Sequence, residues 1–586
     1  MSEISSTSSR TSSSSKAVST SNVAGSETDR ENNEEKLDRR SSSSSSISRV
    51  SLKDVDDPEA FCPDTSAAGE SLYDANRTVS RILTNAEEIE ANTVKCQNEE
   101  LPFGMGFNKP FPPELPDKKL YSVTFDGPND PLHPHNWAWS KKITFFFLLV
   151  MYTFSLAFSS AAYSPAVDVL AEKYHVNEVV TTLGVSLYVL GFASGPVIYA
   201  PLSELYGRKP ILIISSFLFT VFQFAVATAE NLQTILICRF FGSFTGSSAL
   251  VVVPAAFADM FPNKYRGNAI NCFAMVVFVG PLIAPIVGTF ITESYLGWRW
   301  TSYITGIMGG FASLCICLFF EETHHPIILV NKARYLRRRT GNWGIYAPQE
   351  EATLTFREIL ENNISRPVKL LFTEPIIFLL SIYNAFIYGI LYLFLTAYPL
   401  VFYDGYKMKA GVSELPYLGL VIGMLIGGLY CMYVEKSCNE KMKANNNKPV
   451  PEARLPPIMV GGIAFPIGLF WFTWSGNYHE SVHWMVPTAS GLFSGFGLLT
   501  IFIPSLNYIV DSYLILAASA LAANTLVRSA FATAFPLFAK FMFVGMGTNW
   551  AGLLIGLVGV ALAPVPFAFY IYGKRIREKS KYAFVL

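Results

Sequence analysis

The chain has 586 residues, of which 51% are hydrophobic and only 15% are charged, compared with roughly 25% charged residues in an average soluble domain. Lysine plus arginine and aspartate plus glutamate balance at 45 each, so the net charge does not indicate a nucleic-acid partner. The eight cysteines follow no CxxC or metal-ligand spacing, and we expect no metal site.

The first part of the chain, residues 1–140, is polar and contains 19 serines in its first 50 residues. Such a segment buries too little apolar surface to offset its chain entropy, so we expect a disordered Ser-rich tail. Its first 50 residues contain no apolar segment of the kind that a signal peptide needs. The tract from Ser41 to Ser46 is a candidate target for kinases, because phosphorylation adds charge without needing a fold. A plain solvated tail is the alternative.

Beyond residue 141 the sequence changes to long apolar runs. A membrane core of about 30 Å is crossed by about 20 apolar residues in a helix. The runs that meet this length are 143–164, 180–200, 211–229, 234–258, 268–291, 301–320, 375–402, 413–434, 456–474, 484–506, 512–538 and 549–571. They predict an all-α membrane protein with twelve transmembrane helices in two six-helix halves, 141–320 and 374–572. A central loop at 321–373 separates the halves, and a short tail follows at 573–586.

Basic residues are distributed unevenly among the connections between these runs. Lysine and arginine concentrate in cytoplasmic loops, and one set of connections carries most of them. Both termini and the central loop belong to that set, so we expect them to be cytoplasmic. The richer set contains Lys141, Lys142, Arg208, Lys209, Lys264, Arg266, Lys332, Arg334, Arg337, Arg338, Arg339, Lys436, Lys441, Lys443, Arg454, Lys574, Arg575, Arg577 and Lys579. The opposite set contains Lys173, Arg299, Lys407, Lys409 and Lys540.

The connection between the second and third runs is Ala200-Pro-Leu-Ser-Glu204-Leu-Tyr-Gly207-Arg208-Lys209. It resembles the G-x-L-x-D-R-x-G-R-K loop of the major facilitator superfamily, from which it departs at Ala200, Glu204 and Leu205. A carboxylate at a helix end can pair with basic groups and with a neighbouring helix N-terminus.

This loop is a candidate cytoplasmic gate, with Gly207 and Lys209 among its residues. We expect Glu204, Arg208 and Asp259, which lies at the inner end of the fourth run, to form one charge cluster. A salt link of this kind can hold one state of the molecule and break when the halves rock against each other. The alternative is an ordinary basic loop with a tight glycine turn.

Two further motifs lie inside the fourth and fifth runs. The sequence Arg239-Phe-Phe-Gly242-Ser-Phe-Thr-Gly246 resembles the R-x-x-x-G motif of the same family. The sequence Gly280-Pro281-Leu-Ile-Ala284-Pro285-Ile-Val-Gly288 resembles the G-P-x-x-G-G motif of its proton-driven antiporters, with Ala284 and Pro285 in place of two glycines. Small residues let helices approach closely and prolines bend them. Gly280, Pro281 and Pro285 are therefore candidates for conformational coupling.

A wider resemblance covers roughly residues 120–586. The segments that carry it are 121–137, 297–300, 319–326, 451–455 and 511–538. They are similar to fungal twelve-spanner drug:proton antiporters of the polyamine transporter and azole-resistance type. The resemblance implies a proton-coupled antiporter that exports polyamines such as spermidine and spermine, and diverse drugs such as azoles. It implies a monomer without cofactor, in contact with membrane lipid and driven by the proton gradient. It also favours the plasma membrane over the vacuolar membrane.

Two arginines lie inside the apolar runs, where an unpaired charge is costly. Arg239 is in the fourth run. Arg528 is about sixteen residues into the eleventh run, or about 24 Å from its start at 1.5 Å per residue. Each must face a cavity, a carbonyl or a partner. A structural arginine held by backbone carbonyls is the alternative to a functional one.

Other candidates for the cavity are polar and aromatic residues, because we find no carboxylate at mid-depth. Asn384, Tyr388 and Tyr392 share one helical face at i, i+4 and i+8, although such stripes also arise from helix packing. Asn524, inside the eleventh run, and Asp511, just before it, are further candidates for the cavity. An ammonium group binds aromatic faces with about 0.5–2 kcal/mol. The candidate rim acids for a cation are Glu204, Glu321, Glu322 and Glu374, besides Asp511.

Phosphate-binding, zinc and nucleophile motifs are absent from the sequence, and we expect no enzyme activity. Two alternatives to export remain open. One is nutrient uptake by a transporter of the same fold, which the antiporter-type motif in the fifth run disfavours. The other is a membrane sensor that signals through its tail, although the tail contains no recognisable interaction module.

Overall fold

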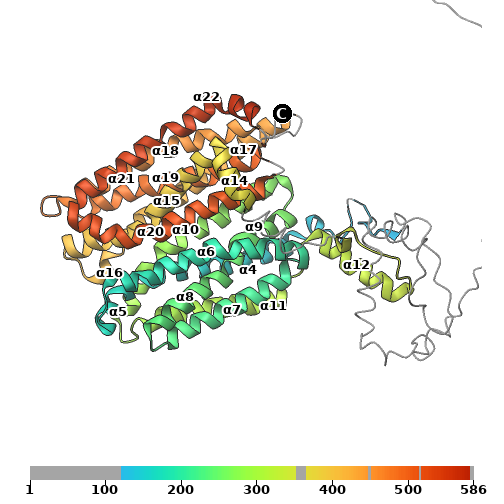
Figure 1. The fold of residues 1–586 in the computed structure, drawn as a ribbon, viewed down its shortest axis with the longest axis horizontal. Coiled ribbons are helices and arrows are strands. Elements are labelled where there is room, and N and C mark those ends of the chain that lie inside the picture. Colours follow the sequence, from blue (N-terminus) through green and yellow to red (C-terminus); the bar gives the residue numbers. More distant parts are fainter. Residues whose placement is uncertain are drawn as a thin grey trace, which may run out of the picture. The chain divides into compact units, whose positions relative to one another are not determined.

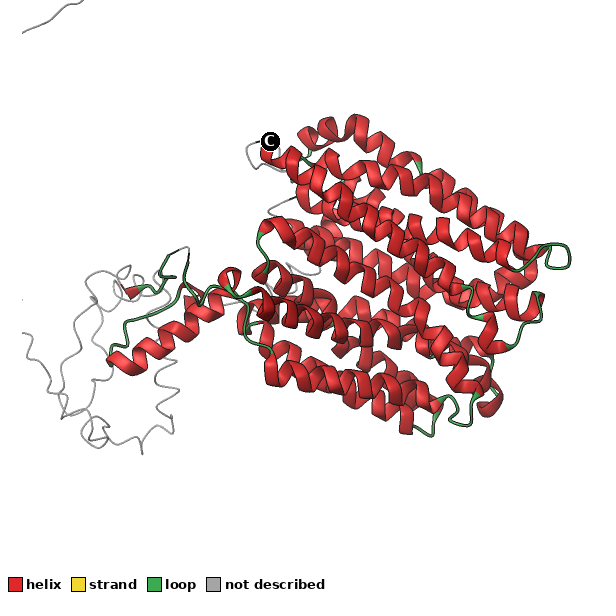
Figure 2. Ribbon diagram, turned by 180° about the vertical axis from the view of Figure 1, so that it is seen from behind, coloured by secondary structure: helices red, strands yellow, loops and turns green. Residues whose placement is uncertain are grey.

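The computed structural model describes residues 121–351 except 128, and residues 365–445, 450–513, 516–580 and 582. These residues belong to one compact unit, formed by 78–95 and 113–586. The part of the expected tail up to residue 120, with its Ser41–Ser46 tract, lies outside the described residues, as do residues 352–364 of the central loop. Within the described part the secondary structure is helical (Figure 2), apart from one isolated bridge between Ser122 and Tyr346.

The first six spans follow one another with short connections. Asn177 begins the second by accepting a hydrogen bond from the Val179 amide, as N-cap residues do. The helices are α4 (Trp139–Ala162) continued by α5 (Val167–Tyr174), α6 (Glu178–Tyr206), α7 (Arg208–Thr228), α8 (Leu232–Gly246) continued by α9 (Ser248–Met260), α10 (Asn263–Glu293) and α11 (Arg299–Phe319).

The central segment contains α12 (His325–Thr340), the short turn η5 (Pro348–Glu351) and α14 (Arg366–Thr373). The last six spans then follow. Their helices are α15 (Pro375–Pro399) with the π-helical turn η7 (Leu400–Gly405), α16 (Ala410–Ser413), α17 (Tyr417–Ala444), η8 (Pro451–Arg454) with α18 (Leu455–Asn477), α19 (Met485–Ser512), α20 (Ala517–Met546), and α21 (Thr548–Leu562) with α22 (Pro564–Lys579).

Twelve helices of the described part are long and apolar enough to cross a membrane. This number confirms the expected fold class. The predicted limits need one substantial correction. The eleventh run was placed at 512–538, whereas Ser512 ends α19 and α20 runs from Ala517 to Met546. The error arises because the residues between the two helices, Tyr513 to Leu516 in the sequence, are themselves apolar, so that hydropathy alone gives no boundary there.

The two ends of the bundle are distinct. We call the end with the start of α4 and the end of α22 the terminal end; α12 extends from it (Figure 1). The other end, with α5 and α16, is called the far end. α15 is the most deeply buried span, with 83% of its most apolar window buried. Its side chains therefore face other helices on nearly all sides.

The two halves meet chiefly where α10 packs against α17 and where α20 packs against α6. Close packing explains the small residues on these faces. A Cβ atom on Gly428 of α17 would lie 2.4 Å from the sulfur of Met275 on α10. Near the far end, Lys540 on α20 forms an ion pair with Glu178 on α6. The halves are thus in contact across both pairs of helices.

Candidate functional site

The loop between α6 and α7 is shaped by one glycine. Gly207 has φ +98°, a conformation that side chains other than glycine rarely adopt. It lets α6 end at Tyr206 and α7 begin at Arg208. A Cβ atom at this position would also lie 2.3 Å from a carboxylate oxygen of Glu322. Both the turn and the approach of Glu322 therefore require glycine.

Glu322 caps the start of α7. Its carboxylate accepts hydrogen bonds from the amides of Arg208 at 2.9 Å and Lys209 at 3.1 Å. It also accepts from the amides of Thr323 at 3.0 Å and His324 at 2.9 Å. Free amides and the helix dipole make a helix N-terminus a good place for a carboxylate. Glu322, which we expected as a rim acid for a cation, is thus occupied by protein amides.

Arg208 and Asp259 form the predicted pair. Arg208 Nε lies 3.2 Å from Asp259 Oδ2, and its guanidinium also donates to Ser203 Oγ at 2.6 Å. The predicted third member is not there. Glu204 is exposed and its carboxylate forms no ion pair within the described chain, while its carbonyl accepts from Gln349. Ser203 faces Arg208, and consecutive helical residues point in different directions, so Glu204 is turned away.

The remaining rim acids also have partners at the terminal end. Glu321 pairs with Lys141 at 2.6 Å. Glu374 is buried and accepts hydrogen bonds from two hydroxyl groups, those of Tyr513 and Ser580, both at 2.8 Å. Both acids are thus bonded to protein groups near the ends of helices.

A second charge network at the terminal end was not expected from the sequence. Arg454 binds Asp511 at 2.9 Å and also pairs with Glu435. A Cβ atom on Gly267 of α10 would lie 2.7 Å from Glu435, so this network abuts the other half. Asp511, proposed for the cavity, is thus a member of a salt-bridge network. Glu435 is the first residue after the apolar run 413–434, and that position is its only sequence signal.

Arg239 is held by backbone carbonyls. It is 2% exposed, and its guanidinium donates to the carbonyls of Gly184 at 2.7 Å, Ser159 at 3.3 Å and Ser160 at 3.2 Å. The guanidinium also lies over the Tyr163 ring, 4.3 Å from its centroid. These contacts tie α8 to α4 and α6. They match the structural alternative stated for this residue.

Arg528 has a different environment. It lies eleven residues after Ala517, the first residue of α20, or about 17 Å along the helix at 1.5 Å per residue. This replaces the expected value of about 24 Å, because the helix begins later. The side chain is half-buried, and its Nε has no hydrogen-bond partner in the described chain. The guanidinium lies 4.8 Å from the Tyr388 ring centroid and 5.3 Å from that of Phe502.

Two buried amides lie on the same pair of helices as Arg528 and Tyr388. Both polar atoms of the Asn384 side chain lack a partner within the described residues, and so does Asn524 Oδ1. We call Asn384, Tyr388, Asn524 and Arg528 the central polar cluster. Unpaired buried polar groups are rare in folded proteins and call for an explanation. A bound ligand or water can supply the missing partners.

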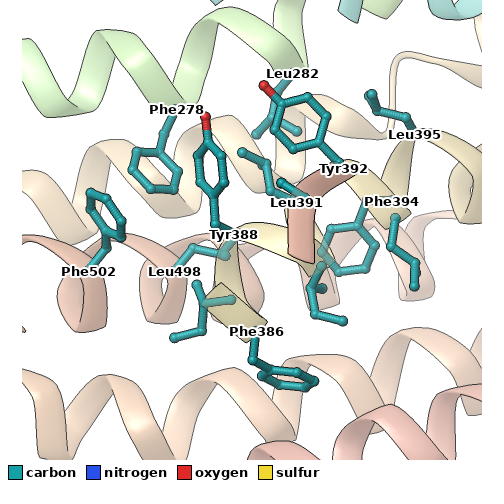
Figure 3. Close-up of a cluster of buried hydrophobic side chains, with 14 of the residues drawn as sticks. Phe278, Leu282, Phe386, Tyr388, Leu391, Tyr392, Phe394, Leu395, Leu498 and Phe502 are labelled. Carbon is teal, nitrogen blue, oxygen red and sulfur yellow. The ribbon is translucent and has the colours of Figure 1, made fainter. Parts of the chain in front are cut away.

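Aromatic rings from both halves surround this cluster. Phe278 of α10 lies 5.5 Å from the Tyr388 ring and 4.6 Å from that of Phe502. Figure 3 shows Tyr388 beside Phe278 and Phe502, while Phe386 points the opposite way. Tyr392 donates a hydrogen bond to Ser160 Oγ at 3.1 Å, across the two halves. The cluster therefore lies where the halves meet.

The fifth span approaches the first through its small residues. A Cβ atom on Gly280 would lie 2.7 Å from that of Ala157 on α4. Pro281 and Pro285 lie inside α10, which continues through both. Interior prolines are tolerated in such helices where neighbours satisfy the freed carbonyls. Their part in conformational coupling stays a prediction.

Twelve apolar helices in two packed halves define a multi-pass membrane protein. A sequence profile described as Major Facilitator Superfamily matches residues 149–536. The chain belongs to the major facilitator superfamily, and it is therefore a transporter of small molecules and not an enzyme. This confirms the family resemblance drawn from the loop motif and the span motifs.

Similar proteins are found among fungi. "Multidrug transporter TPO1_2" of Candida glabrata is 52% identical over 524 residues, covering 89% of each chain. "Major facilitator superfamily multidrug transporter FLU1" of Candida albicans is 52% identical over 518 residues, covering 88% of this chain and 85% of that protein. Among solved structures, the proton:xylose symporter XylE is similar with a TM-score of 0.55 and 16% identity. The match covers 74% of this chain and 97% of that one, and shows the shared fold.

Proposed function

We propose that this protein is a proton-coupled antiporter that exports structurally diverse drugs, azoles among them, and the polyamines spermidine and spermine. The observation that carries the proposal is the identity of 52% with two proteins named multidrug transporters, spread over nearly nine-tenths of the chain.

The central polar cluster supports a site for drugs. Ligand pockets combine apolar and aromatic walls with a few polar groups that fix orientation. Here Tyr388, Phe502 and Phe278 offer aromatic faces, and the amide of Asn384 offers donors and acceptors without protein partners. A largely apolar molecule with one or two polar groups fits this chemistry.

The polyamine part of the proposal rests on the family resemblance and has an electrostatic obstacle. Arg528 places a positive charge at the central polar cluster, which repels a polycation. We place the polyamine nearer the terminal end, where Glu204 keeps an exposed and unpaired carboxylate in the described structure. Neutralising it in Glu204→Gln should reduce spermidine efflux and leave azole efflux intact, with Glu440→Gln, at another exposed acid of that end, as control.

We further propose that the terminal end is cytoplasmic, that the membrane is the plasma membrane, and that the protein works as a monomer without cofactor. In this arrangement the pair Arg208–Asp259 and the capping acid Glu322 form the cytoplasmic gate. The uneven distribution of basic residues supports the orientation.

The test uses inverted plasma-membrane vesicles from cells with and without the protein. Labelled spermidine and a labelled azole are supplied outside, with an imposed pH gradient that is acidic inside. We expect uptake that requires the protein and disappears with a proton uncoupler. Transport that persists in the presence of the uncoupler would indicate a uniporter. Azole transport without spermidine transport would indicate an exporter of drugs alone.

A further inference from the structure

Four carboxylates are buried in the described part of the chain: Asp130, Glu374, Glu414 and Glu435. Three of them have donors. Asp130 accepts from two backbone amides, Glu374 from two hydroxyl groups, and Glu435 pairs with an arginine. Glu414 is 6% exposed, forms no side-chain hydrogen bond or ion pair with any described residue, and has a buried Oε2 without a partner. This one acid is therefore buried without compensation.

Glu414 precedes an aromatic stack in the sequence. It lies between α16 and α17, one helical turn before Tyr417. The Tyr417 ring stacks on Tyr398 at 4.4 Å, and Tyr398 stacks on Phe472 at 4.6 Å. The Tyr417 hydroxyl donates to the Phe394 carbonyl at 2.8 Å, so its hydrogen is not available to Glu414.

The carboxylate has no basic partner among the described residues. α16 packs against α10, α15 and η7. The charged groups on or beside these elements at the far end are exposed, and the basic ones are Lys407 and Lys409. The titratable groups there are Glu293, Tyr398, Tyr403, Asp404, Tyr406, Lys407, Lys409 and Tyr417. No lysine or arginine of the described chain lies within ion-pair distance of Glu414.

The acid lies beside a contact between the halves. Three residues before it, the Gly411 amide donates to Glu293 Oε2 of α10 at 3.1 Å. The Phe290 ring of α10 is also close, because a Cβ atom on Gly411 would lie 2.6 Å from it. If the halves part at the far end, this contact breaks and the surroundings of Glu414 change.

We propose that Glu414 is the acid that takes up the coupling proton from the far side of the membrane, an inference that rests on the proposed proton antiport. A buried carboxylate without donor or cation is costly, whereas its neutral protonated form is much less so. Uptake of one proton by the carboxylate gives a neutral carboxyl group, over which α10 and α16 close. The far end closes only after Glu414 has been protonated. The conformational change of the transporter is thereby coupled to proton uptake.

The test uses purified full-length protein in liposomes, with a labelled azole as the transported probe. Glu414→Gln imitates the protonated acid, and Glu480→Gln, at an exposed acid of the far end, is the matched control. We expect Glu414→Gln to keep azole–azole exchange without a gradient. Accumulation driven by a pH gradient should fall to the level measured without a gradient, while Glu480→Gln behaves as wild type.

The outcomes separate this inference from the proposed function. Gradient-driven accumulation by Glu414→Gln at the level of Glu480→Gln overturns the assignment while leaving proton antiport intact. A wild-type protein without proton-driven transport overturns both. With labelled spermidine as a second probe, loss of spermidine transport alone would assign Glu414 to the binding of an ammonium group and would contradict its role in proton uptake. If Glu414→Gln does not fold, the pH dependence of transport is measured in Glu414→Asp instead. A pH midpoint equal to that of the wild-type protein would contradict the proposal.

Discussion

At the residue scale, Arg239 and Arg528 show that an arginine inside an apolar run can have either a structural or a functional environment. Arg239 donates to carbonyls of three residues and is fully enclosed. Arg528 lies over two aromatic rings and keeps an unpaired Nε in the described structure. The first arrangement stabilises the fold, and the second leaves hydrogen-bonding capacity for something else.

We predict opposite effects for the two substitutions to glutamine. Arg239→Gln leaves buried carbonyls without donors, which should lower the free energy of unfolding by about 2–4 kcal/mol. Arg528→Gln should leave the thermal unfolding midpoint in detergent nearly unchanged and reduce azole transport. A stable, active Arg239 variant would contradict the structural role, and a fully active Arg528 variant would remove this arginine from the site.

The pair of Arg208 and Asp259 gives a second prediction at this scale. Arg208→Ala removes the ion pair and the bond to Ser203 but keeps the amide that Glu322 binds. We expect reduced transport at normal abundance in the membrane, measured by efflux and immunoblot. Arg266→Ala is the control, because Arg266 is an exposed arginine of the same end. Equal transport by the two variants would show that the gate assignment is wrong.

At the element scale, the segment before α4 is tied to α12 by histidines. The ring of His133 lies 4.4 Å from that of His325, and His135 lies 5.3 Å from it. His325 Nε2 is 3.0 Å from the Asp259 carbonyl, which connects this cluster to the gate. Burial lowers the pKa of His133, and the neighbouring rings of His325 and His135 lower it further. Burial also lowers the pKa of His325, against the opposite effect of Asp259.

These shifts predict a segment that loosens in acid. A lowered pKa means that the packed segment favours neutral rings. Its stabilisation is complete above the usual histidine value of about 6.5 and is lost as the pH falls through the lowered values. Hydrogen exchange of residues 129–137 should therefore accelerate between neutral pH and about pH 5. His133→Asn, which retains a residue able to cap the turn at Pro134, should flatten this dependence. An unchanged pH profile in that variant would contradict the prediction.

At the scale of the whole molecule, the expected disorder of residues 1–140 is wrong for the described residues from 121 onward, because this segment belongs to the folded unit. Tyr121 and Val123 exchange backbone hydrogen bonds with Tyr346, and Lys332 binds Asp126 at 2.9 Å and Asp130 at 3.7 Å. The chain before residue 121 lies outside the described residues, and its expected disorder stays a prediction.

Deletion of residues 1–110 should leave transport intact, because every contact just described lies after it. Deletion of residues 1–137 removes the contacts to Lys332 and to His325, and transport should fall. Azole efflux, corrected for protein at the membrane, measures both. Loss of substrate binding in a shorter deletion that reaches the membrane would contradict the assignment of the tail as dispensable for transport.

The class of fold, the twelve spans and the family could all be predicted from the amino-acid sequence. These features depend on local hydropathy, helix length and short motifs, and each can be evaluated along a single stretch of chain. The Arg208–Asp259 pair was also predictable, since a motif places one member and the end of a span places the other.

Which charged side chains are paired and which are exposed becomes known only from the folded structure. Glu204 and Glu322 looked equivalent as acids near span ends, yet one is exposed and the other is bound by four amides. Glu414 attracted no attention in the sequence, because its burial and its lack of a partner in the described chain depend on how distant helices pack. Burial and pairing are properties of contacts between segments far apart in the chain, and hydropathy along one segment carries no information about them.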